Sequence, residues 1–351
     1  GESAPKQVEA RTRLWGFNLS GRRGVMLEGI RFFAASVLMD GSRECELSRC
    51  DFLHHSPWGS FREPFTQRGE RGWYAYGTKE DGTAGVFIRG EENRVAHCTF
   101  RDFWGQGVHL REGRGNVVEH CSFENFNWLM LQDGAAVFLN GEGHEVRDCR
   151  IRNTAAMGIS GKQVGERLVH GVKVLRNDIA DTGRVLLDSG QSAIYFNNHN
   201  APSEQRSLDG EIAWNRIGTV HGIADNGKGI GIYLDDGTDH ANLHHNIVEA
   251  GPKVRWPIFL HAAGHVFENV TVRNNLIWGV PDDPRAAAIV AMPRPKVGAL
   301  REVIIRGNLS SRAIFKVLPG SSDGVTLEAN EENISRERFD QRIKELGVVQ
   351  P

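Results

Sequence analysis

Short apolar strands separated by turn residues recur along most of the chain. One pattern consists of an aliphatic residue, two variable residues, Cys or Asn, one variable residue, and then Phe, Ile or Val. It occurs at Leu47–Cys50–Phe52, Val95–Cys98–Phe100, Val118–Cys121–Phe123, Val146–Cys149–Ile151, Val174–Asn177–Ile179, Ile212–Asn215–Ile217, Leu243–Asn246–Val248 and Val272–Asn275–Ile277, with a degenerate copy at Leu27–Ile30–Phe32. Each interval also holds a second short strand, such as GVFIRG, AIYFNN or GIYLDD. Two strands per repeat of variable length are typical of a solenoid whose coils stack in parallel.

This pattern predicts an all-β fold, a right-handed parallel β-helix of about ten coils that forms a single domain over residues 1–351. Helical repeats are excluded, because no segment before residue 335 keeps an apolar period of 3.6 residues. A propeller is excluded as well. Its blades need four strands each, and the spacing of 23 to 38 residues between successive Cys or Asn positions from Cys98 to Asn275 is too short for them.

Four of the five cysteines occupy the same position in successive repeats, and asparagines continue the series. We call this set the corner ladder: Cys50, Cys98, Cys121, Cys149, Asn177, Asn215, Asn246 and Asn275. Stacked at a turn of the coil, Cys packs as a small apolar group, and Asn can hydrogen-bond to the next Asn. The thiols have no recurrent His partner, so we interpret the ladder as structural rather than as a redox or metal site.

Two segments depart from the repeat. Residues 54–82 form a long insertion in the N-terminal half, and loops of this length on a rigid scaffold are usually functional or disordered. Residues 335–347 read as an amphipathic helix, with Ser335 as N-cap and Gly347 as the stop. We expect this helix to cap the last coil, because an open solenoid end is an exposed sheet edge.

Alternation along the second strand of each coil divides its side chains between the interior and an outward face. The residues predicted to point outward are Phe87, Arg89, His109, Arg111, Phe138, Asn140, Gly158, Ser160, Tyr195, Asn197, Tyr233, Asp235, Phe259 and His261. An aromatic column beside a polar column suits sugar rings, which have an apolar face and a polyhydroxyl edge. We therefore predict an open groove there, with purely structural cross-strand stacking as the alternative.

Carboxylates from neighbouring coils meet in this predicted groove. Asp235 ends one strand, Asp236 follows it at a turn, and Asp188 precedes the strand of the coil before. Acids on adjacent coils would lie roughly 5–10 Å apart, the range in which one protonates a glycosidic oxygen while the other acts as nucleophile or base. Turn chemistry is the alternative, since Asp-Gly and Asp-Ser-Gly sequences are common in turns.

Charge and composition restrict the classes of partner that the protein is expected to bind. The 42 basic and 44 acidic side chains nearly balance, so no polybasic surface predicts a nucleic-acid or membrane partner. The sequence contains no run of about 18 apolar residues, so it predicts no membrane-spanning helix. We expect a monomer that is secreted or periplasmic, although the printed sequence begins without an apolar signal segment. No cofactor is required, and Ca²⁺ is the metal that carboxylates and backbone carbonyls would accommodate.

The segments IADTGR…LDSGQSAIYFNNHN, EIAWNRI…GIGIYLDDGTDHANLHHNIV and VRNNLIWG resemble the bacterial right-handed β-helix repeat proteins of the pectate-lyase-like superfamily. The resemblance covers roughly residues 24–310 and implies a carbohydrate-active β-helix. It also implies that Asp188, Asp235 and Asp236 match the acidic positions of β-helix hydrolases. Here Gln191 and Ser192 interrupt the Asp-Ser-Gly-Ala-Ile-Tyr run, which changes the context of Asp188.

Our leading hypothesis is a glycoside hydrolase that acts on a poly- or oligosaccharide through Asp235 and either Asp188 or Asp236. The residues expected to bind the substrate are Arg111, Asn140, Lys162, Tyr195, Asn197, His199, Tyr233, Trp256 and His261. The second hypothesis is a polysaccharide lyase with Lys162, Arg111 or Lys228 as base, acting on a uronate with or without Ca²⁺. The third is a non-catalytic glycan-binding or structural solenoid.

Overall fold

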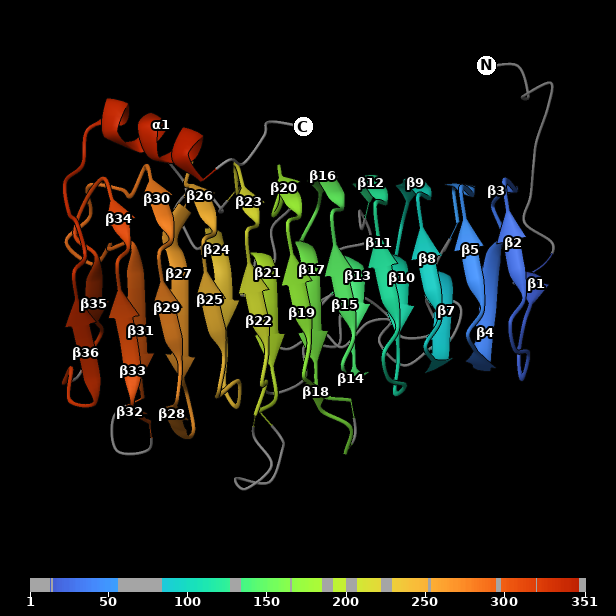
Figure 1. Ribbon diagram of the computed structural model, residues 1–351, viewed down its shortest axis with the longest axis horizontal. Coiled ribbons are helices and arrows are strands. Elements are labelled where there is room, and N and C mark those ends of the chain that lie inside the picture. The colour runs from blue at the N-terminus through green and yellow to red at the C-terminus, as the bar shows by residue number, and fades with distance from the viewer. Residues whose placement is uncertain are drawn as a thin grey trace, which may run out of the picture.

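Three long parallel sheets run the length of the molecule (Figure 1). The computed structural model describes residues 13, 15–55, 84–126, 134–164, 166–184, 192–199, 207–221, 229–251, 254–294, 298–319 and 321–346. Two sheets have eleven strands and one has ten, and every pairing between neighbouring strands within them is parallel. The chain contributes one strand to each sheet in turn, so the predicted right-handed parallel β-helix and its number of coils are confirmed.

Sheet A carries the longer strands. It consists of β1 (Trp15–Asn18), β4 (Ser36–Arg43), β7 (Ala84–Glu91), β10 (Gln106–Leu110), β13 (Ala135–Leu139), β17 (Met157–Lys162), β21 (Ser192–Asn197), β24 (Gly229–Leu234), β27 (Val254–Ala262), β31 (Ile289–Pro293) and β35 (Phe315–Val317). These strands include the segments whose alternation predicted an outward polar and aromatic face.

Sheets B and C hold the two strands that flank the corner ladder. Sheet B consists of β2 (Met26–Glu28), β5 (Glu46–Ser48), β8 (Arg94–Ala96), β11 (Val117–Glu119), β15 (Glu145–Arg147), β19 (Lys173–Leu175), β22 (Glu211–Ala213), β25 (Asn242–His244), β29 (Thr271–Arg273), β33 (Val303–Arg306) and β36 (Val325–Glu328). Sheet C consists of β3 (Arg31–Phe33), β6 (Asp51–Leu53), β9 (Thr99–Phe103), β12 (Ser122–Phe126), β16 (Arg150–Thr154), β20 (Asp178–Ala180), β23 (Arg216–Ile217), β26 (Ile247–Glu249), β30 (Leu276–Trp278) and β34 (Leu309–Ser310). Two short pairs, β14 (Gly141–Glu142) with β18 (Val169–His170) and β28 (Val266–Glu268) with β32 (Ala299–Arg301), extend the turns.

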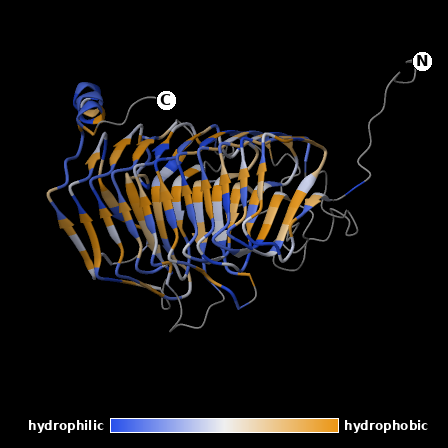
Figure 2. Ribbon diagram, turned by 45° about the vertical axis from the view of Figure 1, so that its right-hand side comes forward, coloured by the Kyte–Doolittle hydropathy of each residue, from blue (hydrophilic) through white to orange (hydrophobic). Residues whose placement is uncertain are grey.

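The core fills the space that the three sheets enclose. Its apolar side chains stack coil over coil, as the register of Ile194, Ile232 and Ile258 in sheet A illustrates. In sheet C the rings of Phe52 and Phe100 stack at a centroid distance of 4.7 Å. Apolar bands along the strands and hydrophilic turns are visible in Figure 2. Burial of these aligned side chains supplies the main driving force for folding.

The corner ladder lies inside the turn between sheets B and C. The Asn215 side chain donates to the Asn246 Oδ1 atom at 3.0 Å and to the Val174 carbonyl at 2.8 Å. The same two bonds recur at later coils, and the ladder extends beyond the predicted set to Asn308 and Asn330. All five cysteines are buried free thiols, and burial raises the pKa of the Cys121 thiol. The burial of the thiols and the repeated asparagine bonds support the structural interpretation of the ladder.

A helix lies near the C-terminus, as predicted. It spans Arg336–Glu345 (α1), and the Ser335 hydroxyl accepts from the Arg338 amide at 3.2 Å. Its expected position over the open end is wrong. The buried Phe339 packs against strands β26, β30 and β34 of sheet C, whereas β36 keeps Leu327 55% exposed. The apolar stripe is matched by an apolar patch on the side of the solenoid, so the helix covers that patch.

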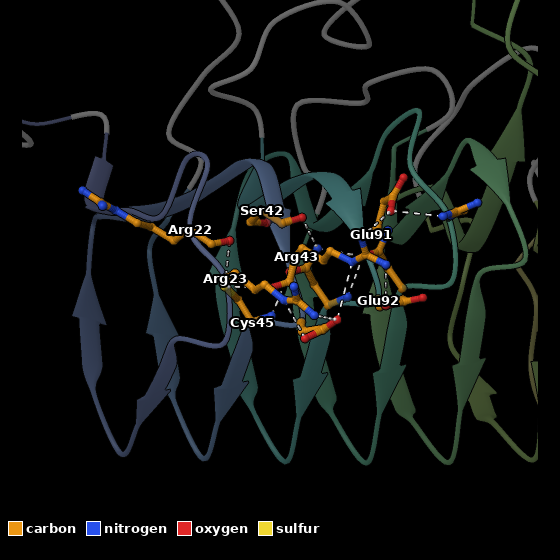
Figure 3. Close-up of polar contacts among 11 residues, drawn as sticks. Arg22, Arg23, Ser42, Arg43, Cys45, Glu91 and Glu92 are labelled. Carbon is orange, nitrogen blue, oxygen red and sulfur yellow. Dashed lines mark hydrogen bonds and ion pairs between the residues drawn. The ribbon is translucent and has the colours of Figure 1, made fainter.

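Charged side chains cross-link the N-terminal coils at the turn between sheets A and B (Figure 3). Arg23 pairs with Glu44 at 2.9 Å, and Arg43 pairs with Glu92 at 3.5 Å. These side chains are substantially exposed, and such pairs contribute little to stability. The predicted insertion at residues 54–82 lies almost entirely outside the described residues, which include only its first two positions.

Candidate active site on sheet A

Six predicted site residues form one column across sheet A, which we call the polar column: Arg111, Asn140, Lys162, Asn197, Asp235 and His261. The strand register aligns the preceding residues Leu110, Leu139, Gly161, Phe196, Leu234 and Leu260 one above the other. It also pairs Lys162 directly with Asn197. Residues far apart in the chain therefore lie on adjacent coils, as the repeat predicted.

Asp235 is the centre of the most connected part of the column. Its Oδ2 atom accepts from the Tyr195 hydroxyl at 3.0 Å and from the Asn197 side-chain amide at 2.8 Å. Its Oδ1 atom lies 2.8 Å from His261 Nδ1 and accepts from the backbone amide of Asp236 at 2.9 Å. Three consecutive strands, β21, β24 and β27, thus contribute to one carboxylate.

These contacts keep the Asp235 carboxylate ionised. Burial by itself raises the pKa of this group, since its side chain is only 14% exposed. The bond and charge of His261, the Asp236 amide and Asn197 outweigh that effect, and the pKa of Asp235 falls below its usual range. A carboxylate held in this way can act as a nucleophile or base, but it is a poor proton donor at neutral pH.

His261 links Asp235 to a second aromatic hydroxyl. Its Nδ1 atom lies 3.1 Å from the Tyr233 hydroxyl as well as within reach of Asp235. Burial, followed by the charge of Asp235, raises the pKa of Tyr233 well above its ordinary value, so this phenol stays protonated. About a quarter of the His261 side chain is exposed.

Asp236 belongs to a neighbouring but separate cluster. Its side chain is 2% exposed, and its Oδ2 atom lies 2.6 Å from His199 Nδ1. The Gly264 backbone amide donates to Oδ1 at 3.0 Å, and His265 Nε2 lies 4.0 Å from Oδ2. His199, Asp236 and His265 offer ligand atoms within 4.8 Å of one another, so they could hold a metal ion. The turn interpretation also holds here, because Gly237 adopts a φ of 73°.

The aromatic column is present, but it is not an open stacking surface. Tyr195, Tyr233, Phe259 and Trp256 all point outward from sheet A and pack together, yet each is less than a tenth exposed. This corrects the expectation of an open aromatic groove. Alternation determines the side of the sheet on which a ring lies, but it does not determine whether that side is open to solvent.

The structure distributes the other predicted binding residues differently. Asn140 is fully buried, and its side-chain amide donates to the carbonyls of Lys162 and Arg167 at 3.0 and 2.8 Å. Its amide therefore supports the backbone of the next coil, and the substrate-binding role of Asn140 stays a prediction. Arg111 contacts Glu112 and lies four strands from Asp235, roughly 19 Å away at the usual strand spacing.

Two predicted site residues lie outside the described structure, and one site residue of the described structure was not predicted. Asp188, the predicted partner carboxylate, and Lys228 lie outside the described residues, so their roles stay predictions. His265 was not predicted. It lies between β27 and β28, where strand alternation gives no orientation, and its spacing of four residues from His261 was the signal that could have found it.

A family model for the right handed beta helix region matches residues 30–292 of the chain. No curated relative matches by sequence. Among solved structures, a mannuronic acid specific polysaccharide family 6 lyase from human gut microbiota is 14% identical, with a TM-score of 0.57, covering 92% of this chain and 77% of that one. DFA-IIIase from Arthrobacter chlorophenolicus A6 without its lid is 14% identical, with a TM-score of 0.51, covering 86% and 71%. The Streptococcus pneumoniae surface protein and adhesin PfbA is 10% identical, with a TM-score of 0.50, covering 88% and 82%. At these identities the likeness shows the fold.

No helix in the described part of the chain is long and apolar enough to cross a membrane.

Proposed function

Because this chain belongs to the right-handed β-helix family, we propose that it is a carbohydrate-active enzyme, a glycoside hydrolase that cleaves a poly- or oligosaccharide at Asp235. The observation that carries the proposal is the Asp235 carboxylate, which is desolvated and bound by residues of three coils. A structural turn residue would not need a tyrosine, an asparagine and a histidine from neighbouring strands. Lyase and DFA-IIIase neighbours on the same fold support a carbohydrate substrate.

The chemistry assigns Asp235 to the nucleophile or base. In hydrolysis an acid donates a proton to the glycosidic oxygen as the bond to the anomeric carbon breaks, while a carboxylate attacks that carbon or removes a proton from the attacking water. Asp235 is ionised, which fits the second role and excludes the first at neutral pH. Tyr195 and Asn197 hold its Oδ2 atom and leave little freedom of rotation.

The acid in this proposal is Asp188. Asp236 is a poor candidate, because its carboxylate faces His199 and the Gly264 amide and is almost fully buried. Asp188 stands a short distance before β21 in sequence, and β21 is the strand that supplies Tyr195 and Asn197 to Asp235. That placement in the repeat is the reason for choosing it.

One observation favours a lyase as the second candidate. The Nδ1 atom of His261 is bound to Asp235, an arrangement that orients the ring, and in the neutral form of the ring the Nε2 atom is a suitable base. In β-elimination that base would remove the proton α to a uronate carboxylate, and the bond to the leaving sugar oxygen would break to give an unsaturated product. Lys162, in the same column, could neutralise the uronate.

The test is to incubate the full chain with a panel of neutral and uronate-containing glycans. A hydrolase releases reducing ends without the ultraviolet absorbance of an unsaturated uronate, whereas a lyase produces both. Asp235→Asn and Asp188→Asn should each lower kcat/KM by roughly 10²-fold or more. Asp282→Asn, at an exposed aspartate that pairs with Arg312, should leave the activity unchanged.

Native-like thermal melting of each variant separates loss of activity from loss of folding. Asp235→Asn with native melting and full activity would refute the assignment of Asp235. Glycan binding that is saturable but yields no product from any member of the panel would favour a non-catalytic solenoid, the role that the adhesin neighbour illustrates.

A further inference from the structure

Three potential metal ligands converge from three consecutive coils beside Asp235. His199 follows β21, Asp236 follows β24, and His265 lies between β27 and β28. One ligand atom from each lies within 4.8 Å of the other two, and the described part of the chain contains no other such group. Neighbouring coils bring these residues together in the same way as they build the polar column.

The backbone around the group is held in place. The Asn197 Oδ1 atom accepts from the His199 backbone amide at 2.8 Å, which fixes the start of that turn. Asp236 is anchored through its Oδ1 atom by Gly264, so its Oδ2 atom is left to face both histidines. A Cβ atom at Gly264 would lie 3.0 Å from this Oδ2 atom and 3.8 Å from the His199 ring. Any larger residue at position 264 would crowd the space between the ligands.

The geometry lies close to that of a metal site. In a tetrahedral zinc site each ligand atom is about 2.0–2.2 Å from the ion, so two ligand atoms are roughly 3.3 Å apart. The Asp236 Oδ2 atom lies 2.6 Å from His199 Nδ1 and 4.0 Å from His265 Nε2, on either side of that value. His199 is 54% exposed and His265 is 29% exposed, so both rings have room to adjust.

We propose that His199, Asp236 and His265 bind a divalent transition-metal ion, with Zn²⁺ as the reference. Two imidazole nitrogens and one carboxylate oxygen favour zinc and its neighbours over Ca²⁺, which prefers six to eight oxygen ligands. Three protein ligands leave a coordination position for water or for a substrate oxygen on the exposed side of the histidines.

The ion would also order the residues around Asp235. Asn197 donates to Asp235 through its nitrogen and accepts from His199 through its oxygen, so the two clusters share one side chain. The Asp236 backbone amide also donates to Asp235. Metal binding at His199 and Asp236 therefore stiffens both bridges to the Asp235 carboxylate.

The experiment measures metal binding directly and uses no substrate. The full chain, freed of any affinity tag and treated with chelator, is titrated with Zn²⁺ by calorimetry, and with Co²⁺ while its visible absorbance is recorded. We expect saturable binding of one ion per chain and a Co²⁺ spectrum of low coordination number. His199→Gln and His265→Gln should each weaken the binding by at least about 10-fold.

His240→Gln is the matched control, because His240 is a surface histidine whose ring contacts Ser207 and Asn269 away from the three ligands. It should bind Zn²⁺ as the parent chain does. The proposal is overturned if no saturable binding occurs, or if the His199→Gln/His265→Gln double variant binds as tightly as the parent. Neither result bears on glycan cleavage, so the two proposals can fail independently.

Discussion

Two stacks of polar side chains run along this β-helix, and they differ in how they use the repeat. In the corner ladder, Asn177, Asn215 and Asn246 make the same two hydrogen bonds at successive coils and are fully buried. In the polar column, Asn197 and Asp235 occupy equivalent positions on adjacent coils, but their side chains differ and bond to each other. A position that repeats its chemistry supports the fold, whereas a position that changes its chemistry from coil to coil can carry a site.

The largest expected loss of stability comes from removing one asparagine of the corner ladder. Asn246→Ala removes the acceptor of the Asn215 amide and the donors to the Ile212 carbonyl and to Asn275. Because these groups are buried and cannot bind water, we expect a loss of about 2–4 kcal/mol in the free energy of unfolding. Urea denaturation followed by circular dichroism measures this loss.

Asn197→Ala is the matched change in the polar column. Asn197 lies in the polar column on the outward face of sheet A, is 9% exposed, and donates to Asp235 and Tyr195. We expect the free energy of unfolding to fall by about 1 kcal/mol or less. At a temperature where both variants are folded, Asn197→Ala should lose a larger fraction of glycan cleavage than Asn246→Ala. Equal losses of stability in the two variants would contradict the distinction between the stacks.

The ladder explains why the sequence predicts this fold so well. A Cys or Asn at nearly every coil, flanked by apolar residues, is a strong periodic signal, and the structure pairs the flanking apolar residues in register. The turn geometry was not predictable. The residues before Asn177, Asn215 and Asn246 adopt positive φ although none of them is glycine, so composition gives no indication of the left-handed turn.

The site was predictable only in part. Strand alternation placed Asn197, Asp235 and His261 in one column, because side-chain direction in a strand follows from position. It could not give the burial of Tyr195, which depends on what covers the sheet, or the position of His265, which lies in a turn. The same limit applies to α1, whose apolar stripe predicted a helix but not the surface that it covers.

A smaller effect on stability is expected from His109, which lies on the outward face of sheet A. His109 is buried between Phe87 and Phe138, and neither ring nitrogen has a hydrogen-bond partner in the described structure. Burial, followed by the charge of Arg111, lowers the pKa of His109 to about 3. The ordinary value is about 6.5, so between these pH values the unfolded chain binds more protons than the folded one. As far as His109 is concerned, the free energy of unfolding is therefore highest above about pH 6.5. It decreases as the pH falls, by on the order of 1 kcal/mol per pH unit.

His109→Phe should remove this contribution and join two flanking rings into a continuous aromatic stack. We expect a gain of about 1 kcal/mol at neutral pH and a flatter decline between pH 6 and pH 4, measured by urea denaturation across that range. His144, whose pKa burial lowers to about 4, would keep part of the slope in the variant. An unchanged slope would mean that His109 is not buried as a neutral ring.

The smallest effect tests the junction at which the ladder changes from cysteine to asparagine. The Cys149 backbone amide already donates to the Asn177 Oδ1 atom at 3.0 Å. One of the ladder's hydrogen bonds to asparagine is therefore present one coil before the first asparagine. Cys149→Asn would place an amide where it can donate to Asn177 and to the Val118 carbonyl, which the thiol now contacts only at 3.7 Å. Asparagine and cysteine are similar in volume, and we expect stabilisation by about 0.5–1 kcal/mol. Cys149→Ser, whose hydroxyl is too short for both bonds, should instead destabilise by about 1 kcal/mol. If both variants lose stability equally, the cysteine half of the ladder depends on apolar packing alone, and polar continuity would support only the coils that follow Cys149.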